Sequence, residues 1–369
     1  MNTARNKKSF QKFTILFILV VCYGCYFQME HNELSDVDII RVLGIDKSAD
    51  GYKITALYHD NNAGNSDAGM KAMEGEGDSV YQAYENMKRK NNRSLTIGHT
   101  SFYLFSDSVC SDGLLNCMDF ISRDQTVKTN ASVFILENEN INTFLKKTID
   151  DKLFIHESLA SISSKQKAVL TKIDNTLLDV LDGITDDSKN LLLPYLVADN
   201  SSLYPNGYAV FKGDQLYDYL DYDTSLALDL FRKRLRSFPV FLENNVDLEI
   251  TNYKVNETAS LDKQNLILHI QMSFQSDIRE VGNNTQIFNE KSLDALQTLQ
   301  NKYIQSKLDE IISVMKKEKV DLLGIQNLLA AQADLDWNNI QKNWDSYLAA
   351  ITYQYNIQSK VAKNYIISK

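Results

Sequence analysis

A long amphipathic segment from Ser292 to Lys317 limits most strongly what this chain can fold into. Its apolar side chains recur every three or four residues, which predicts a helix with one buried stripe. The stripe is made of Leu293, Leu296, Leu299, Tyr303, Leu308, Ile311, Ile312 and Met315. A helix of this kind is stable only when another layer covers the stripe, so it predicts a helix packed on a sheet.

The residues after this helix change their pattern twice. The run D-L-L-G-I at 321–325 contains a glycine that can take a turn which a side chain would resist. A second helix is then predicted, with Trp337 and Trp344 on one face. From 347 to 357 every other residue is apolar or aromatic, which predicts a strand.

Two further strands are predicted before the long helix. Residues 246–255 mix polar and apolar side chains, and 266–274 alternate strictly, as in a half-buried antiparallel strand. The predicted fold class is therefore α+β and multi-domain, with mixed or antiparallel sheets that are each packed with helices. In the C-terminal domain the long helix covers an antiparallel sheet.

Composition excludes several classes of protein. The 369 residues are enough for two or three domains, and only 3 prolines argue against long disordered linkers. The net charge of -9 and the scattered Lys and Arg residues argue against nucleic-acid binding. With 4 cysteines, the chain has no disulfide framework.

The amino terminus has the features of an export segment. Basic residues between Arg5 and Lys12 precede an apolar run at 13–21, which is shorter than a spanning helix requires. In one interpretation residues 1–25 are a lipoprotein signal peptide, and Cys25 becomes the lipidated first residue of the mature chain. In the other the segment stays as a short uncleaved anchor. Either way the rest of the chain lies outside the cytoplasm and is tied to a membrane.

The first half of the chain alternates strands and helices. Apolar runs at 39–45 and 52–58, separated by an Asp-Gly turn, predict a hairpin. Residues 61–77 are rich in Gly, Asn, Asp and Ala and predict a loop. A helix is predicted at 78–90, a continuous strand at 96–105, a helix that carries both Cys110 and Cys117, and successive helices over 140–193.

No motif in the sequence indicates catalysis, a metal site or a cofactor. His99 is interpreted as a hydrogen-bonded core residue or a packing residue, and Cys110 and Cys117 as packing residues. The acidic residues Asp174, Asp179, Asp182, Asp186 and Asp187 are expected to form a solvated face. A basic cluster around the end of a predicted helix at 223–236 is expected to complement the helix dipole, and a role at a membrane surface is the alternative. It contains Arg232, Lys233, Arg234 and Arg236.

Several motifs together resemble the Ger(x)C family, the C subunits of spore germinant receptors. They are E-L-x-D from Glu33, G-I-D at 44–46, Gly98-His99, the Arg123-Asp124 helix end, the hairpin at 207–220 and the Trp337 to Tyr355 segment. The resemblance implies a protein that is lipid-anchored at Cys25 on the outer face of the inner spore membrane. It also implies two integral-membrane partners, an A-type and a B-type subunit, of which one is transporter-like, and a response to small nutrient germinants.

The sequence therefore predicts a non-catalytic scaffold without a cofactor. Its predicted divisions are the signal peptide (1–25), an N-terminal germination-protein domain (26–198), a middle hairpin-helix module (199–245) and a C-terminal domain (246–369). The alternative is an extracytoplasmic solute-binding lipoprotein that holds a small nutrient directly. That class uses a cleft between two doubly wound α/β lobes, whereas the alternating strands here favour antiparallel sheets.

Overall fold

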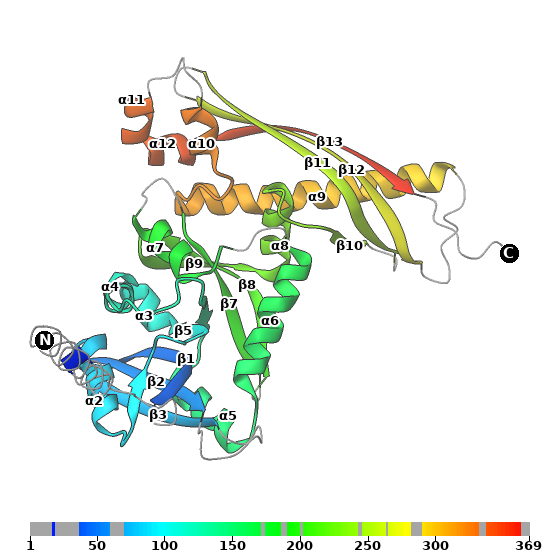
Figure 1. The fold of residues 1–369 in the computed structure, drawn as a ribbon. Coiled ribbons are helices and arrows are strands. Elements are labelled where there is room, and N and C mark those ends of the chain that lie inside the picture. Colours follow the sequence, from blue (N-terminus) through cyan, green and yellow to red (C-terminus); the bar gives the residue numbers. More distant parts are fainter. Residues whose placement is uncertain are drawn as a thin grey trace, which may run out of the picture.

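The structure is a computed structural model that describes residues 17–18, 37–59, 70–170, 174–185, 190–199, 202–242, 246–262, 265–281, 290–331 and 337–362. These residues form one sheet of nine strands and one of four, each packed with helices (Figure 1). The predicted α+β class with mixed sheets is confirmed. Among the described residues, no helix is long and apolar enough to cross a membrane.

The nine-stranded sheet has a parallel centre and antiparallel edges. Its order is β3-β2-β1-β5-β6-β7-β8-β9, and β4 pairs with β1 beside this path. The neighbours among β1, β5, β6 and β7 are parallel, and the other neighbours along the path are antiparallel. The strands are β1 (Val37–Ser48), β2 (Gly51–His59), β3 (Met70–Gly77), β4 (Ser94–Thr96), β5 (Phe102–Ser106), β6 (Ser132–Leu136), β7 (Leu192–Asp199), β8 (Ser202–Lys212) and β9 (Gln215–Asp221).

Helices cover both faces of this sheet. One face packs against α2 (Val80–Arg89), α3 (Asp107–Asp112), α4 (Leu115–Arg123) and α7 (Leu177–Thr185). The other packs against α5 (Ile141–Asp150) and α6 (Ile155–Val169). Side chains of β5 alternate between the two cores, which is why its sequence is a continuous apolar run.

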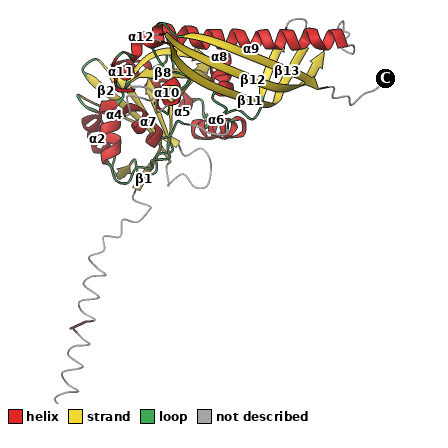
Figure 2. Cartoon of the chain, turned by 90° about the horizontal axis from the view of Figure 1, so that it is seen from above, coloured by secondary structure: helices red, strands yellow, loops and turns green. Residues whose placement is uncertain are grey.

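The four-stranded sheet is organised around the long helix predicted from the sequence. Its order is β10 (Phe238–Leu242), β11 (Val246–Asp262), β12 (Asn265–Val281) and β13 (Thr352–Ala362). Helix α9 (Glu290–Glu318) lies along this sheet (Figure 2) and shares one core with it and with α8 (Tyr222–Phe231). Leu308, Ile311 and Met315 are fully buried, which confirms the predicted stripe over the second half of the helix, whereas Leu299 is 39% exposed.

Two details of this sheet differ from the prediction. Strand β13 pairs with β12 in parallel, because the long crossover through α9 returns the chain to the same end of the sheet. The strand also begins at Thr352, since the preceding residues form α11 (Trp337–Lys342) and α12 (Trp344–Ala349) instead of one helix and an earlier strand. The two tryptophan rings still pack together, with centroids 6.2 Å apart.

The glycine-rich stretch 61–77 was predicted as a loop, which is wrong for its second half. Residues 70–77 form β3, which pairs with β2, while residues 60–69 lie outside the described chain. The glycines of β3 are needed because α2 crosses the strand closely. A Cβ atom added at Gly75 would stand 2.1 Å from the carbonyl oxygen of Ala83. Glycine is present here because the backbones of β3 and α2 approach closely, and not because the chain turns.

The predicted strand at 96–105 is also interrupted. It is divided into β4 and β5, and residues 97–101 form a turn that carries His99. The predicted hairpins at 39–58 and 207–220 are confirmed as β1–β2 and β8–β9.

The segment 199–245 contributes to both sheets, since β8 and β9 extend the first sheet and β10 belongs to the second. The domain limits given above stay a prediction.

Candidate functional site

The residues that the sequence singled out for chemistry do not form a reaction centre in the described chain. Cys25, Asp186 and Asp187 lie outside the described residues. His99 is exposed on a turn, so its interpretation as a core residue is wrong. No group of three or more potential metal ligands occurs among the residues that the structure describes.

Cys110 and Cys117 are buried, free thiols, as expected for packing residues. They belong to two short helices, α3 and α4, and not to one, because the chain breaks at Gly113 with a φ of 115°. Burial raises the pKa of Cys110 well above its usual value and that of Cys117 to about 12. Both therefore stay protonated at neutral pH, which excludes the thiolate that a nucleophile requires.

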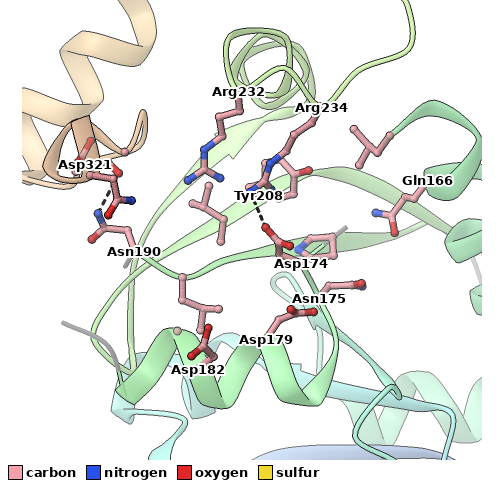
Figure 3. A pocket seen from close by; sticks show the side chains of 17 residues that line it. Gln166, Asp174, Asn175, Asp179, Asp182, Asn190, Tyr208, Arg232, Arg234 and Asp321 are labelled. Carbon is pink, nitrogen blue, oxygen red and sulfur yellow. Dashed lines mark hydrogen bonds and ion pairs between the residues drawn. The ribbon is translucent and has the colours of Figure 1, made fainter. Parts of the chain in front are cut away.

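A polar cavity lies where the two sheets meet (Figure 3). It has a volume of about 310 Å³ and is built from three stretches that are far apart in sequence: 166–194, 208–234 and 321–327. Charged and amide side chains gather around it. They are Gln166, Asp174, Asn175, Asp179, Asp182, Asn190, Arg232, Arg234, Asp321 and Asn327.

The arginines enter the cavity because of how α8 ends. Asp221 caps the start of α8, and its side chain accepts a hydrogen bond from the Thr224 amide. After the last turn, Lys233 takes a left-handed conformation with a φ of 60°, which stops the helix. Arg232 and Arg234 on either side of it line the cavity, whereas Lys233 pairs with Glu257 at 3.3 Å. The cluster therefore does more than complement a helix dipole.

The acidic residues before and in α7 are part of this cavity as well. Asp174 forms an ion pair with Arg234 at 2.5 Å. Asp179 caps α7 by accepting a hydrogen bond from the Thr176 amide at 2.9 Å. Asp174, Asp179 and Asp182 line the cavity. The expected solvated face is wrong for Asp174 and Asp179, which are half-buried, whereas Asp182 is exposed as expected.

The D-L-L-G-I run brings a buried carboxylate to the same place. Gly324 is left-handed, with a φ of 75°, and opens α10 (Ile325–Ala330). Asp321 is only 4% exposed, and its Oδ2 accepts a hydrogen bond from the Gln326 amide at 2.7 Å. Its backbone oxygen accepts a hydrogen bond from Nδ2 of Asn190 at 3.1 Å. This hydrogen bond connects the turn at 321–324 to the chain just before β7 of the first sheet. Burial raises the pKa of Asp321.

Behind the arginines lies a buried hydrogen-bonded pair. The Tyr208 hydroxyl donates to Oδ2 of Asp229 at 2.7 Å. Burial raises the pKa of Asp229 to about 6 and that of Tyr208 well above its usual value. This pair fixes the last turn of α8 on β8, and it therefore positions the arginines that follow.

The guanidinium of Arg232 is half-buried in the wall of this cavity. It forms no ion pair or side-chain hydrogen bond with the residues that the structure describes, unlike Lys233 and Arg234 beside it. Burial and the neighbouring Arg234 lower its pKa. Since an arginine stays charged in proteins, the cavity contains a cation that lacks a direct counter-ion in the described chain.

Comparison with known proteins identifies the chain. The profile of the spore germination protein N-terminal domain matches residues 30–198, and that of the spore germination B3/GerAC-like C-terminal domain matches residues 206–364. The chain belongs to the Ger(x)C family of spore germination proteins, which confirms the resemblance inferred from the motifs.

Individual relatives agree with this assignment. The chain is 23% identical to spore germination protein KC of Bacillus subtilis (strain 168), over 90% of this chain and 89% of the relative. It is 19% identical to spore germination protein GerQC of Bacillus cereus, over 95% and 98%. The crystal structure of the GerBC protein has the same fold, with a TM-score of 0.55 at 15% identity over 87% of this chain and 97% of that one.

Proposed function

We propose that this chain is the non-catalytic C subunit of a nutrient germinant receptor. In this proposal a lipid on Cys25 holds it at the extracytoplasmic face of the inner spore membrane. Its folded body contacts an A-type and a B-type integral-membrane subunit and supports the receptor's response. The observation that carries the proposal is the pair of family profiles, which together extend over residues 30–198 and 206–364.

The amino-terminal sequence supports the proposed anchor. The first family match begins at residue 30, and the basic residues, the apolar run and Cys25 all precede it. This order is that of an exported protein whose body follows directly on its membrane attachment.

The alternative, a solute-binding lipoprotein with two doubly wound lobes, is less well supported. In the described chain one sheet has a parallel centre with helices on both faces. The other is antiparallel except for its last strand. The residues that the structure describes therefore do not form two similar α/β lobes.

A substitution of the anchor cysteine tests the proposal. We expect Cys25→Ala to remove palmitate labelling, to release the protein from spore membranes and to impair nutrient germination. Cys22→Ala is the matched control, because it removes a cysteine three residues earlier and leaves the proposed acceptor. Normal membrane retention and a normal germination response in Cys25→Ala would contradict the lipid anchor.

A further inference from the structure

The cavity between the sheets is lined by a half-buried cation without an ion pair in the described chain and by a buried carboxylate with one oxygen that accepts no hydrogen bond there. The cation is the guanidinium of Arg232, which points from the end of α8 into the cavity (Figure 3). The oxygen is Oδ1 of Asp321, which is buried and has no hydrogen-bond partner among the described residues. Both side chains line the same space, yet they are not within 4.0 Å of each other.

This arrangement lowers the stability of the fold unless a bound molecule interacts with both Arg232 and Asp321. A charge that is removed from water without a direct counter-ion destabilises a fold, and so does an acceptor without a donor. Arg234 cannot compensate Arg232, since it has the same sign and is paired with Asp174. The missing partner has to offer an anionic group to Arg232 and a donor to Asp321.

The size and the walls of the cavity limit that partner. A volume of about 310 Å³ is at the lower end of known small-molecule sites and corresponds to roughly ten water molecules. Leu170, Leu191, Leu192 and Pro194 supply apolar wall next to the charged groups. Apolar walls with a few converging polar groups are typical of ligand sites.

We propose that this cavity binds a small zwitterion, with its carboxylate on Arg232 and its ammonium group on Asp321. The fork of the guanidinium fits a carboxylate with two parallel hydrogen bonds. The carboxylate of Asp321, held at Oδ2 by the Gln326 amide, presents Oδ1 as a fixed acceptor. A short aliphatic chain between the two ligand charges lies against the leucines and Pro194.

The ligand also touches both halves of the molecule. Arg232 and Asp321 belong to segments that share the core of the second sheet, while Asn190, Leu191 and α7 belong to the first. A ligand that contacts both walls binds only the assembled arrangement, so it raises the Tm. This inference is independent of the proposed anchor and partners, because binding requires the folded chain alone.

Calorimetric titration of the full-length chain in detergent micelles tests the site. The probes are glycine, β-alanine and 4-aminobutyrate, in which the two charges are progressively further apart. Butyrate and butylamine each carry only one of these charges. We expect saturable binding of at least one zwitterion, at least tenfold tighter than that of either single-charge probe, and a raised Tm. The absence of saturable binding for all three zwitterions, or equal binding of butyrate, would overturn the proposal.

Variants then assign the roles of the two residues. Arg232→Gln should weaken zwitterion binding at least tenfold, whereas Arg236→Gln, an exposed arginine outside the cavity, should leave it unchanged. Asp321→Asn keeps an oxygen for the Gln326 amide but should abolish the preference for the zwitterion over butyrate.

The Tm without ligand separates a binding role from a structural one. If Arg232 is a binding residue, Arg232→Gln has a Tm at or above that of the unmodified chain, because a half-buried charge without an ion pair in the described chain is removed. Wild-type affinity in Arg232→Gln would overturn the assignment. Should this variant not fold, the comparison of zwitterions with butyrate and butylamine on the unmodified chain still tests the proposed site.

Discussion

Glu74, in the stretch that the sequence predicted as a loop, connects three elements of the first sheet and its helices. Its Oε2 lies 2.6 Å from Nζ of Lys146, 2.6 Å from Nδ2 of Asn142 and 3.3 Å from Nζ of Lys53. These contacts join β3 to α5 and β2. The hydrogen bond from Lys146 is the main reason why the pKa of Glu74 falls to about 2, and Asn142 and Lys53 add to it.

This lowered pKa predicts a defined pH dependence of stability. The stabilisation is fully present above the ordinary value of 4.5 and is lost as the pH falls through about 2. Glu74→Gln should therefore lower the free energy of unfolding at pH 7 by about 1 kcal/mol, a value reduced for the partial exposure of the side chain. Urea unfolding at pH 7 and pH 3 should show a smaller difference at the lower pH.

Glu76→Gln is the control for Glu74, since Glu76 is 58% exposed and pairs only with Lys53 among the described residues. Its effect should be smaller at both pH values. If Glu74→Gln unfolded with the same pH dependence as the unmodified chain, the charged cluster would not contribute as described.

At the scale of elements, the contact between β3 and α2 depends on Gly75 and Gly77, where an added Cβ would stand 2.1 Å from the Ala83 oxygen and 2.6 Å from the Ala83 nitrogen. A methyl group at Gly75 would meet the backbone of Ala83 and the side chain of Met87, and neither can move without displacing α2. Gly75→Ala should therefore destabilise the protein by about 2 kcal/mol, the usual cost of overpacking. Thermal unfolding measures the effect.

Gly213→Asn is the matched control for this substitution. Gly213 has a φ of 62°, which asparagine tolerates, and nothing lies within 4 Å of its added Cβ. Its Tm should stay close to that of the unmodified chain. An equally small effect of Gly75→Ala would show that α2 does not pack on β3 at this distance.

The sequence predicted elements where the pattern is local and long. Helix α9 follows from a stripe that repeats over its whole length, and the β1–β2 hairpin follows from two apolar runs and an Asp-Gly turn. Strand β3 was missed because its glycines reflect contact with a helix and not a turn. The boundary between α12 and β13 was misplaced because Tyr347, Ala349 and Ile351 also fit the alternation of a strand.

The cavity was not predicted, because it is assembled from segments that only the fold brings together. Arg232 and Arg234 were noted as a cluster after a helix, but their sequence neighbours do not reveal that they face Asn190 and Asp321. Asp321 belonged to a motif that was recognised for its glycine. The sequence did contain charged residues at 174–182, 232–234 and 321 for which no motif gave a role. Nothing in the sequence showed that these three groups lie close together.

At the scale of the whole molecule, two sheets with a common junction form a body that the Ger(x)C family shares. We propose that this body acts by contact with membrane subunits. Affinity purification of the tagged chain from detergent-solubilised spore membranes, followed by mass spectrometry, tests it most directly. We expect an A-type and a B-type integral-membrane subunit to be recovered with it in comparable amounts. Recovery of the chain alone, or from the soluble fraction without either subunit, would contradict it.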